Sequence, residues 1–244
     1  MQGFGADRPL LLMGCGHMGH ALAVGWLRAG LSPEHLYVVD PSATPDRLPG
    51  AKPGLARFAD EHTLVISVAA GVPIDVLEAG VGVDATYVRA MPNTPAAIGA
   101  GITGLTGRED ISAANKALAR ELLHAVGETV WIDRETDMNA VTAVSGSGPA
   151  YVFHLVECMA YAGAELGLDT ETAMQLARQT VIGAARLMDE ETEVSAGELR
   201  QRVTSPGGTT EAALKVLRRP DDGLAELMVR ALSAAKIRGE ALGG

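Results

Sequence analysis

Three glycines near the start of the chain have the spacing of a phosphate-binding loop. The stretch reads Gly14-Cys15-Gly16-His17-Met18-Gly19, the pattern G-x-G-x-x-G. Between a strand and a helix, the first glycine allows a tight turn, the second lets the backbone approach a pyrophosphate, and the third lets the helix pack on the strand. The N–H groups at the helix N-terminus then attract the anion. The loop therefore predicts a dinucleotide site, which we favour over a purely structural turn.

An acidic residue follows at the distance expected of a ribose contact. Asp40 lies about 20 residues beyond Gly19, at the end of the second predicted strand. A carboxylate there accepts hydrogen bonds from the adenine ribose hydroxyls and repels a 2′-phosphate. Asp40 therefore favours NADH over NADPH, although the nearby Arg47 would weaken that preference.

Two further glycine-rich clusters occur in the second half of the chain. They are Ser145-Gly146-Ser147-Gly148-Pro149-Ala150-Tyr151 and Thr204-Ser205-Pro206-Gly207-Gly208-Thr209-Thr210, each leading into a predicted helix. Hydroxyl groups and bare backbone amides at a helix start form a nest for a small anion such as a carboxylate. For the first cluster, a helix break that permits close helix packing is an equal alternative. For the second, the hydroxyl residues beside two glycines favour ligand binding.

The elements that would position these loops change character along the chain. Short apolar strands first alternate with helices, which predicts a doubly wound parallel α/β sheet. After Asp133, long helical patterns take over. We therefore predict a dinucleotide-binding domain over residues 1–133 and a helical domain for substrate and dimerisation over 134–244. The predicted strands are Leu10–Met13, Leu36–Asp40, Leu64–Val68, Thr86–Met91, Ile102–Leu105 and Thr129–Ile132, and the predicted helices are His20–Ala29, Ser112–Val126, Thr136–Val144, Ala150–Leu166, Thr170–Met188, Glu211–Leu217 and Leu224–Leu242.

Composition narrows the function classes. The net charge of −10 over 244 residues has the wrong sign for binding nucleic-acid phosphates. No stretch provides the roughly 20 apolar residues of a membrane span, and no secretory signal is visible, so we expect a cytoplasmic protein with no membrane partner. Cys15 and Cys158 lack the spacing of a disulfide framework or a metal site, so we expect no metal. The six histidines share no catalytic spacing.

The helical domain has more apolar faces than a small monomeric domain hides. Examples are Ala160, Ala164 and Leu168 on one predicted helix and Val181, Ala184, Ala185 and Met188 on the next. Such faces predict a homodimer as the minimum assembly.

Three stretches resemble the most recognisable motifs of the pyrroline-5-carboxylate reductase family, in the family's order. They are Arg89-Ala90-Met91-Pro92-Asn93-Thr94-Pro95-Ala96, Ser145–Tyr151 and Val203–Thr210. The stretch Leu64–Val72 is similar to the strand that precedes the first motif, and the resemblance runs from about Leu10 to Leu242. It implies a Rossmann-type domain followed by an all-α dimerisation domain. The implied activity is reduction of 1-pyrroline-5-carboxylate to L-proline, the last step of proline biosynthesis, with NADH or NADPH, in a homodimer or a higher homo-oligomer.

The same resemblance implies roles for individual residues. Ser205 and the backbone from Gly207 to Thr210 would bind the substrate, with the Gly208 to Thr210 amides on its carboxylate. The Thr210 hydroxyl would lie near the ring nitrogen, which makes Thr210 and Ser205 the candidate catalytic residues. Glu193 would face the substrate amine from the partner subunit. Residues that would border the cofactor, besides the glycine loop and Asp40, are Lys52, Ala69, Met91, Pro92 and Asn93.

One region departs from the family pattern. Pro41, Pro45, Pro49 and Pro53 recur at every fourth residue between Asp40 and Leu64, which forbids a helix there. The family usually has a helix, a strand and a further helix in this region, ending in Lys-Pro-Gln, and here only Lys52-Pro53-Gly54 is recognisable. We therefore expect a shortened sheet that lacks at least one strand and part of the cofactor wall.

Two alternatives remain open at this point. A related Rossmann imine or hydroxyacid reductase would need a catalytic lysine in the helical domain, and the candidate, Lys215, lies after the glycine nest. A degenerate paralogue would dimerise or bind a metabolite without catalysis. The intact second motif favours the reductase.

Overall fold

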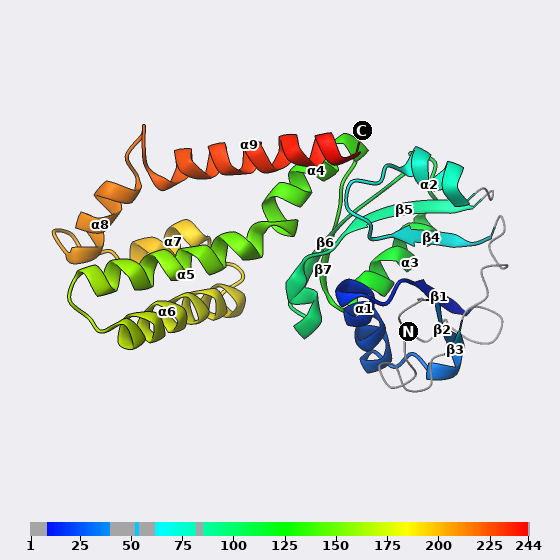
Figure 1. Cartoon of the computed structure of the whole chain (residues 1–244), viewed down its shortest axis with the longest axis horizontal. Coiled ribbons are helices and arrows are strands. Elements are labelled where there is room, and N and C mark those ends of the chain that lie inside the picture. The colour runs from blue at the N-terminus through cyan, green and yellow to red at the C-terminus, as the bar shows by residue number, and fades with distance from the viewer. Residues whose placement is uncertain (1–8, 40–51, 54–61, 82–84, 244) are drawn as a thin grey trace. The chain divides into compact units, whose positions relative to one another are not determined.

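The computed structural model describes residues 9–39, 52–53, 62–81 and 85–243 (Figure 1). Asp40 and Arg47, on which the cofactor preference depends, lie outside the described residues, as do Pro41, Pro45 and Pro49. The chain forms two compact units, one comprising residues up to Pro149 together with those from Ala235 onward, and the other Ala150–Ala234. The helical segment from Asp133 to Pro149 thus belongs to the same compact unit as the sheets.

Seven strands form two hydrogen-bonded sheets in the described part of the first unit. The first sheet has the order β1 (Leu10–Met13), β2 (Leu36–Val39) and β3 (Lys52–Pro53), and all its pairs are parallel. The second has the order β4 (Leu64–Ser67), β5 (Thr86–Met91), β6 (Gly101–Gly107) and β7 (Gly127–Trp131). The proline-rich region thus supplies the short strand β3, with Pro53 at a sheet edge, where a missing N–H is tolerated.

One strand runs against the predicted direction. β6 pairs antiparallel with β5, with Met91 opposite Gly104, whereas β4–β5 and β6–β7 are parallel. A fully parallel sheet is therefore the wrong prediction for β6. The physical reason is the short connection over residues 92–100, which contains only the 3₁₀ helix η2 (Thr94–Ile98). A parallel crossover needs a dozen or more residues.

A single apolar core joins both sheets to helices α1 (His17–Arg28) and α3 (Ala113–His124). The Trp26 indole N–H donates to the Leu122 carbonyl at 2.8 Å, which ties the two helices together. Helix α2 (Ile74–Val81) follows β4. Helix α1 begins three residues before the predicted His20, because the second half of the glycine loop is already helical. The core members include Leu12, Leu22, Trp26, Leu36, Val88, Leu105, Leu123 and Val126.

The first glycine-rich cluster, for which a helix break and a ligand contact were equal alternatives, begins in a widened helical turn. After the 3₁₀ turn η3 (Glu135–Asp137) and α4 (Met138–Val141), the chain widens into the π-helical turn η4 (Thr142–Gly146). The Ser145 hydroxyl donates to the Val141 carbonyl at 3.0 Å, within the helix. Gly146 packs closely on the end of β5, since a Cβ atom there would lie 2.6 Å from Met91 Cε.

The second unit is built of helices with well-defined starts. They are α5 (Gly148–Glu165), α6 (Thr170–Glu190), α7 (Ala196–Arg202), α8 (Thr209–Leu217) and α9 (Leu224–Gly243), of which α5 begins and α9 ends in the first unit. Asp169 caps α6 by accepting the Thr172 N–H at 2.9 Å, and Ser195 and Glu198 form a capping box at the start of α7. No described helix is long and apolar enough to cross a membrane.

This helical unit has almost no core of its own. Its buried apolar side chains are Ala160, Ala173, Ala177 and Leu199. On α5, by contrast, Phe153 is 65% exposed and Tyr161 is 69% exposed. Aromatic side chains gain most from burial. The helices therefore expose apolar faces of the kind that a protein partner covers.

Candidate active site

The glycine loop has the backbone geometry of an anion cradle. Gly14 adopts φ of +84°, a conformation that side chains rarely allow. Gly16 is the N-cap of α1, and a Cβ atom there would meet nothing within 4 Å. A Cβ atom on Gly19 would lie 2.1 Å from the Gly14 carbonyl oxygen, so the helix is packed directly on the loop.

The start of α1 is open to an anion. In the described structure, this helix has no side-chain cap and no acidic residue in its first turn. Its first N–H groups therefore keep their hydrogen-bonding capacity, and the helix dipole favours negative charge there. Within the loop, Cys15 is buried and His17 is exposed. The arrangement fits the pyrophosphate of a dinucleotide.

The other residues assigned to the cofactor lie after parallel strands or at their ends. Ala69 follows β4, and its N–H donates to Ser67 Oγ at 3.3 Å. Met91 ends β5, and Pro92 and Asn93 follow it, both buried. Because β4 and β5 are parallel, these positions share one edge of the sheet, where ligands of α/β proteins bind. Lys52 lies in β3, paired with Tyr37 of β2.

Asn93 already has a structural partner. Its Oδ1 atom accepts the Ile102 N–H at 3.0 Å and thereby fixes the start of β6. This bond uses one of the two lone pairs of the oxygen, so the second lone pair and the amide N–H donors of Asn93 can still contact a ligand.

A partly buried ion pair that includes a residue of β5 was not predicted from the sequence. Glu135 Oε1 accepts both the Ile74 N–H, at 2.8 Å, and Arg89 Nη1, at 3.3 Å. The Arg89 side chain is only 7% exposed and that of Glu135 27%. Glu135 thus joins the start of α2 to strand β5. The available signal was an arginine inside an otherwise apolar strand, because a buried cation needs a partner.

The second cradle lies at the start of α8. Gly207 adopts φ of +72°, and the Gly208 N–H closes a turn on the Ser205 carbonyl at 3.0 Å. The Gly207 N–H donates to Glu211 Oε2 at 2.6 Å. Gly208 is the N-cap of α8, which has no side-chain cap. Within the part of the chain that the structure describes, the amides of Thr209 and Thr210 therefore remain available, as the first N–H groups of a helix are.

Two of the four backbone amides assigned to the substrate are thus engaged within the loop. The Ser205 hydroxyl lies against Gly208, where a Cβ atom would be 2.5 Å from Oγ. The Thr210 side chain is half-buried. Glu193 lies exposed in the turn between α6 and α7, in the same compact unit.

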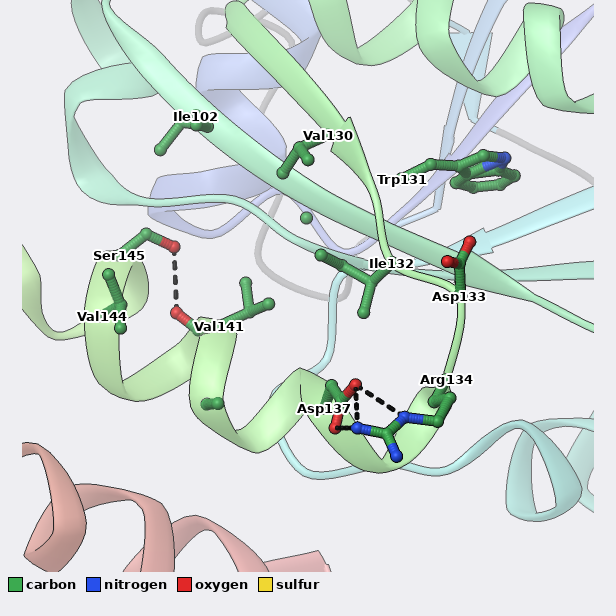
Figure 2. Close-up of a pocket in the computed structure, with 12 residues that line it drawn as sticks. Ile102, Val130, Trp131, Ile132, Asp133, Arg134, Asp137, Val141, Val144 and Ser145 are labelled. Carbon is green, nitrogen blue, oxygen red and sulfur yellow. Dashed lines mark hydrogen bonds and ion pairs between the residues drawn. The ribbon is translucent and has the colours of Figure 1, made fainter.

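A separate cavity of about 730 Å³ lies between the second sheet and the helical turns that follow it. Figure 2 shows Ile102, Val130, Ile132 and Val141 around it, with the Arg134–Asp137 ion pair at one side. None of the described residues assigned to the cofactor or the substrate lines this cavity. The described residues also contain no group of three or more His, Cys, Asp or Glu able to hold a metal ion.

Comparison with known proteins agrees with this geometry. Residues 135–242 match the family model described as pyrroline-5-carboxylate reductase dimerisation. The pyrroline-5-carboxylate reductase of Pseudomonas aeruginosa is 46% identical over 201 residues, covering 82% of this chain and 72% of that protein. That of Haemophilus influenzae is 36% identical over 240 residues, covering 85% of this chain and 88% of that protein.

The chain belongs to the pyrroline-5-carboxylate reductase family. A solved pyrroline-5-carboxylate reductase from Coxiella burnetii is 37% identical, with a TM-score of 0.85 over 96% of this chain and 98% of that one. Pyrroline carboxylate reductase from Plasmodium falciparum, solved with NADP bound, is 28% identical with a TM-score of 0.78, and each chain is covered in full. The predicted Rossmann-type domain followed by an all-α dimerisation domain is thereby confirmed.

Proposed function

We propose that this protein reduces 1-pyrroline-5-carboxylate to L-proline with NADH or NADPH. The observation that carries the proposal is that this chain, a member of the family, has two backbone cradles for anions. One opens α1 and fits a pyrophosphate, and the other opens α8 and fits a small carboxylate. Lys215, the lysine that a related imine or hydroxyacid reductase would need, is paired with Glu211 on the surface of α8.

The first cradle would hold a nicotinamide dinucleotide through the N–H groups at the start of α1. A bound reduced nicotinamide would supply the hydride. The Plasmodium relative with NADP bound supports this class of cofactor. Gly16 leaves space for the pyrophosphate, and Met91 and Pro92 would border the nicotinamide at the edge where β4 and β5 end. A preference for NADH, based on Asp40, stays a prediction.

The second cradle would orient the substrate. The Thr209 and Thr210 amides and the Ser205 hydroxyl would hold the carboxylate, which leaves the flat ring to be placed by the surrounding loop. As the ring carbon of the C=N bond gains a hydride, the nitrogen needs a proton. The half-buried Thr210 hydroxyl is the candidate donor, directly or through water.

The proposed enzyme is a homodimer. Residues 135–242 match the family's dimerisation model, and the helical unit buries few apolar side chains by itself. Both observations indicate that a second copy completes the core of this unit. We propose the cytoplasm as the location, which stays a prediction from the sequence.

The test is a binding and turnover assay on the purified protein. NADH is added first and its fluorescence enhancement is measured, and 1-pyrroline-5-carboxylate is then added while the loss of NADH absorbance is followed. The same assay with NADPH gives the ratio of catalytic efficiencies. We expect binding and turnover with at least one cofactor. Cofactor binding without turnover would contradict the proposal and favour a non-catalytic paralogue.

A further inference from the structure

Glu211 turns back from α8 onto the loop that precedes that helix. Its Oε2 atom accepts the Gly207 N–H at 2.6 Å, and its Oε1 atom lies 3.5 Å from Lys215 Nζ, one turn further along α8. The Glu211 side chain is 37% exposed and that of Lys215 is 72% exposed. The carboxylate is therefore held at the edge of the second cradle, with its charge partly offset by the lysine.

This contact restrains the most flexible part of the loop. Adjacent glycines have the widest backbone freedom of any residue pair, and fixing them costs the most conformational entropy. Here the Gly207 N–H is held by Glu211 and the Gly208 N–H by the Ser205 carbonyl. With both glycines fixed, the Ser205 hydroxyl and the Thr209 and Thr210 amides keep defined positions before any ligand arrives.

We propose that Glu211 is a positioning residue for the substrate carboxylate. It does not touch the substrate, and it acts by holding Gly207 so that the donors of Ser205, Thr209 and Thr210 are arranged in advance. Such preorganisation raises the affinity for the substrate because the loop loses its conformational entropy on folding rather than on binding. This inference rests on the proposed function, since it assigns the Thr204–Thr210 loop to the substrate.

A competing interpretation predicts the opposite sign. A carboxylate beside an anion site also repels a second carboxylate, and Glu211 would then compete with the substrate for the Gly207 amide. Removing Glu211 raises the substrate KM if Glu211 positions the loop, and lowers the KM if Glu211 competes. The direction of the change therefore separates the two roles.

The variants are Glu211→Ala, Glu211→Gln and Glu211→Asp. Glu211→Gln keeps an acceptor oxygen of the same reach, whereas Glu211→Asp keeps the charge but is one methylene too short to reach Gly207. We expect Glu211→Ala and Glu211→Asp to raise the KM for 1-pyrroline-5-carboxylate about tenfold, or about 1.4 kcal/mol. The kcat and the KM for NADH should stay within about twofold, and Glu211→Gln should restore most of the substrate affinity.

The matched control is Glu226→Ala, which removes the acidic residue from the first turn of α9. Hydrogen exchange of the Gly207 amide should accelerate in Glu211→Ala and stay unchanged in Glu226→Ala. An unchanged or lower substrate KM in both Glu211→Ala and Glu211→Asp would overturn the proposal. Glu211→Asp serves as the deciding variant where the alanine protein does not fold.

Calorimetric binding of L-proline in the presence of NAD⁺ separates this inference from the proposed function. If the wild-type protein turns over the imine and Glu211→Asp has the same KM, the inference fails while the function stands. If the wild-type protein is inactive but binds L-proline about tenfold more tightly than Glu211→Asp does, the function fails while the role of Glu211 stands.

Discussion

The third glycine of the first loop, Gly19, packs against the backbone of the first, Gly14. A Cβ atom on Gly19 would lie 2.1 Å from the Gly14 carbonyl oxygen, whereas one on Gly16 would meet nothing within 4 Å. The two glycines therefore have separable roles, one in the fold and one at the ligand.

Alanine substitutions test this separation. Gly19→Ala should lower the thermal midpoint by several degrees, because backbone rather than a flexible side chain must move. Gly16→Ala should lower the thermal midpoint less than Gly19→Ala does, since it only replaces the N-cap glycine by a poorer N-cap residue, and should weaken NADH binding about tenfold or more, since its methyl group enters the space assigned to the pyrophosphate. Thermal unfolding and NADH fluorescence titration measure the two effects. Equal losses of stability in both variants would contradict the assignment.

A second prediction concerns the buried Arg89 and its partly buried partner Glu135. Glu135→Ala leaves the Arg89 cation and the Ile74 N–H without their shared acceptor. Breaking such a pair from one side costs about 3 kcal/mol of unfolding free energy. Urea unfolding at fixed protein concentration measures the loss. The control is Asp137→Ala, whose ion pair with the exposed Arg134 should contribute less than about 1 kcal/mol. Similar losses in the two variants would show that Glu135 does not hold α2 to β5.

A third prediction concerns the hydroxyl of Thr210. Thr210→Val keeps the shape of the side chain and removes the candidate proton donor. We expect kcat to fall by roughly 10- to 1000-fold with little change in NADH affinity. Steady-state kinetics, with NADH titration as the control for cofactor binding, measure both quantities. An unchanged kcat would remove Thr210 from the proposed mechanism.

A fourth prediction concerns acid stability at the start of α6. Hydrogen bonding from Thr172, through its side chain and then its backbone N–H, lowers the pKa of Asp169 below its ordinary value. The associated stabilisation is fully present above the unfolded pKa of about 3.9 and is lost as the pH falls through the lower folded value. Asp169→Asn keeps a neutral cap. The wild-type protein should therefore be the more stable of the two near neutral pH, and the difference in thermal midpoint should shrink below about pH 4. A difference independent of pH would contradict the titration of Asp169.

Six of the seven described strands could be predicted from sequence to within a few residues because each is a short apolar run between turn residues, whereas β3 (Lys52–Pro53) was not predicted. The direction of β6 was predicted wrongly, because strand orientation depends on the connection between strands rather than on the apolar run itself. The informative signal was the length of the segment over residues 92–100, which cannot hold a parallel crossover.

The glycine clusters show a similar division. Sequence located the loop around Gly207, but the partner of its N–H lies in the following helix, at Glu211, and only the fold brings them together. Around Gly146, the sequence left a helix break and a ligand contact as equal alternatives, and the structure places this glycine in a π-helical turn that packs closely on the Met91 side chain. Local patterns therefore found the sites, and long-range packing decided their geometry.

The small number of buried apolar side chains in the helical unit has a consequence for how the protein folds. Few apolar side chains between Ala150 and Ala234 are buried, so the proposed homodimer would supply most of the apolar burial of this unit. Folding of the unit would then be a bimolecular reaction: its rate would rise with protein concentration, and dilution would favour the unfolded chain.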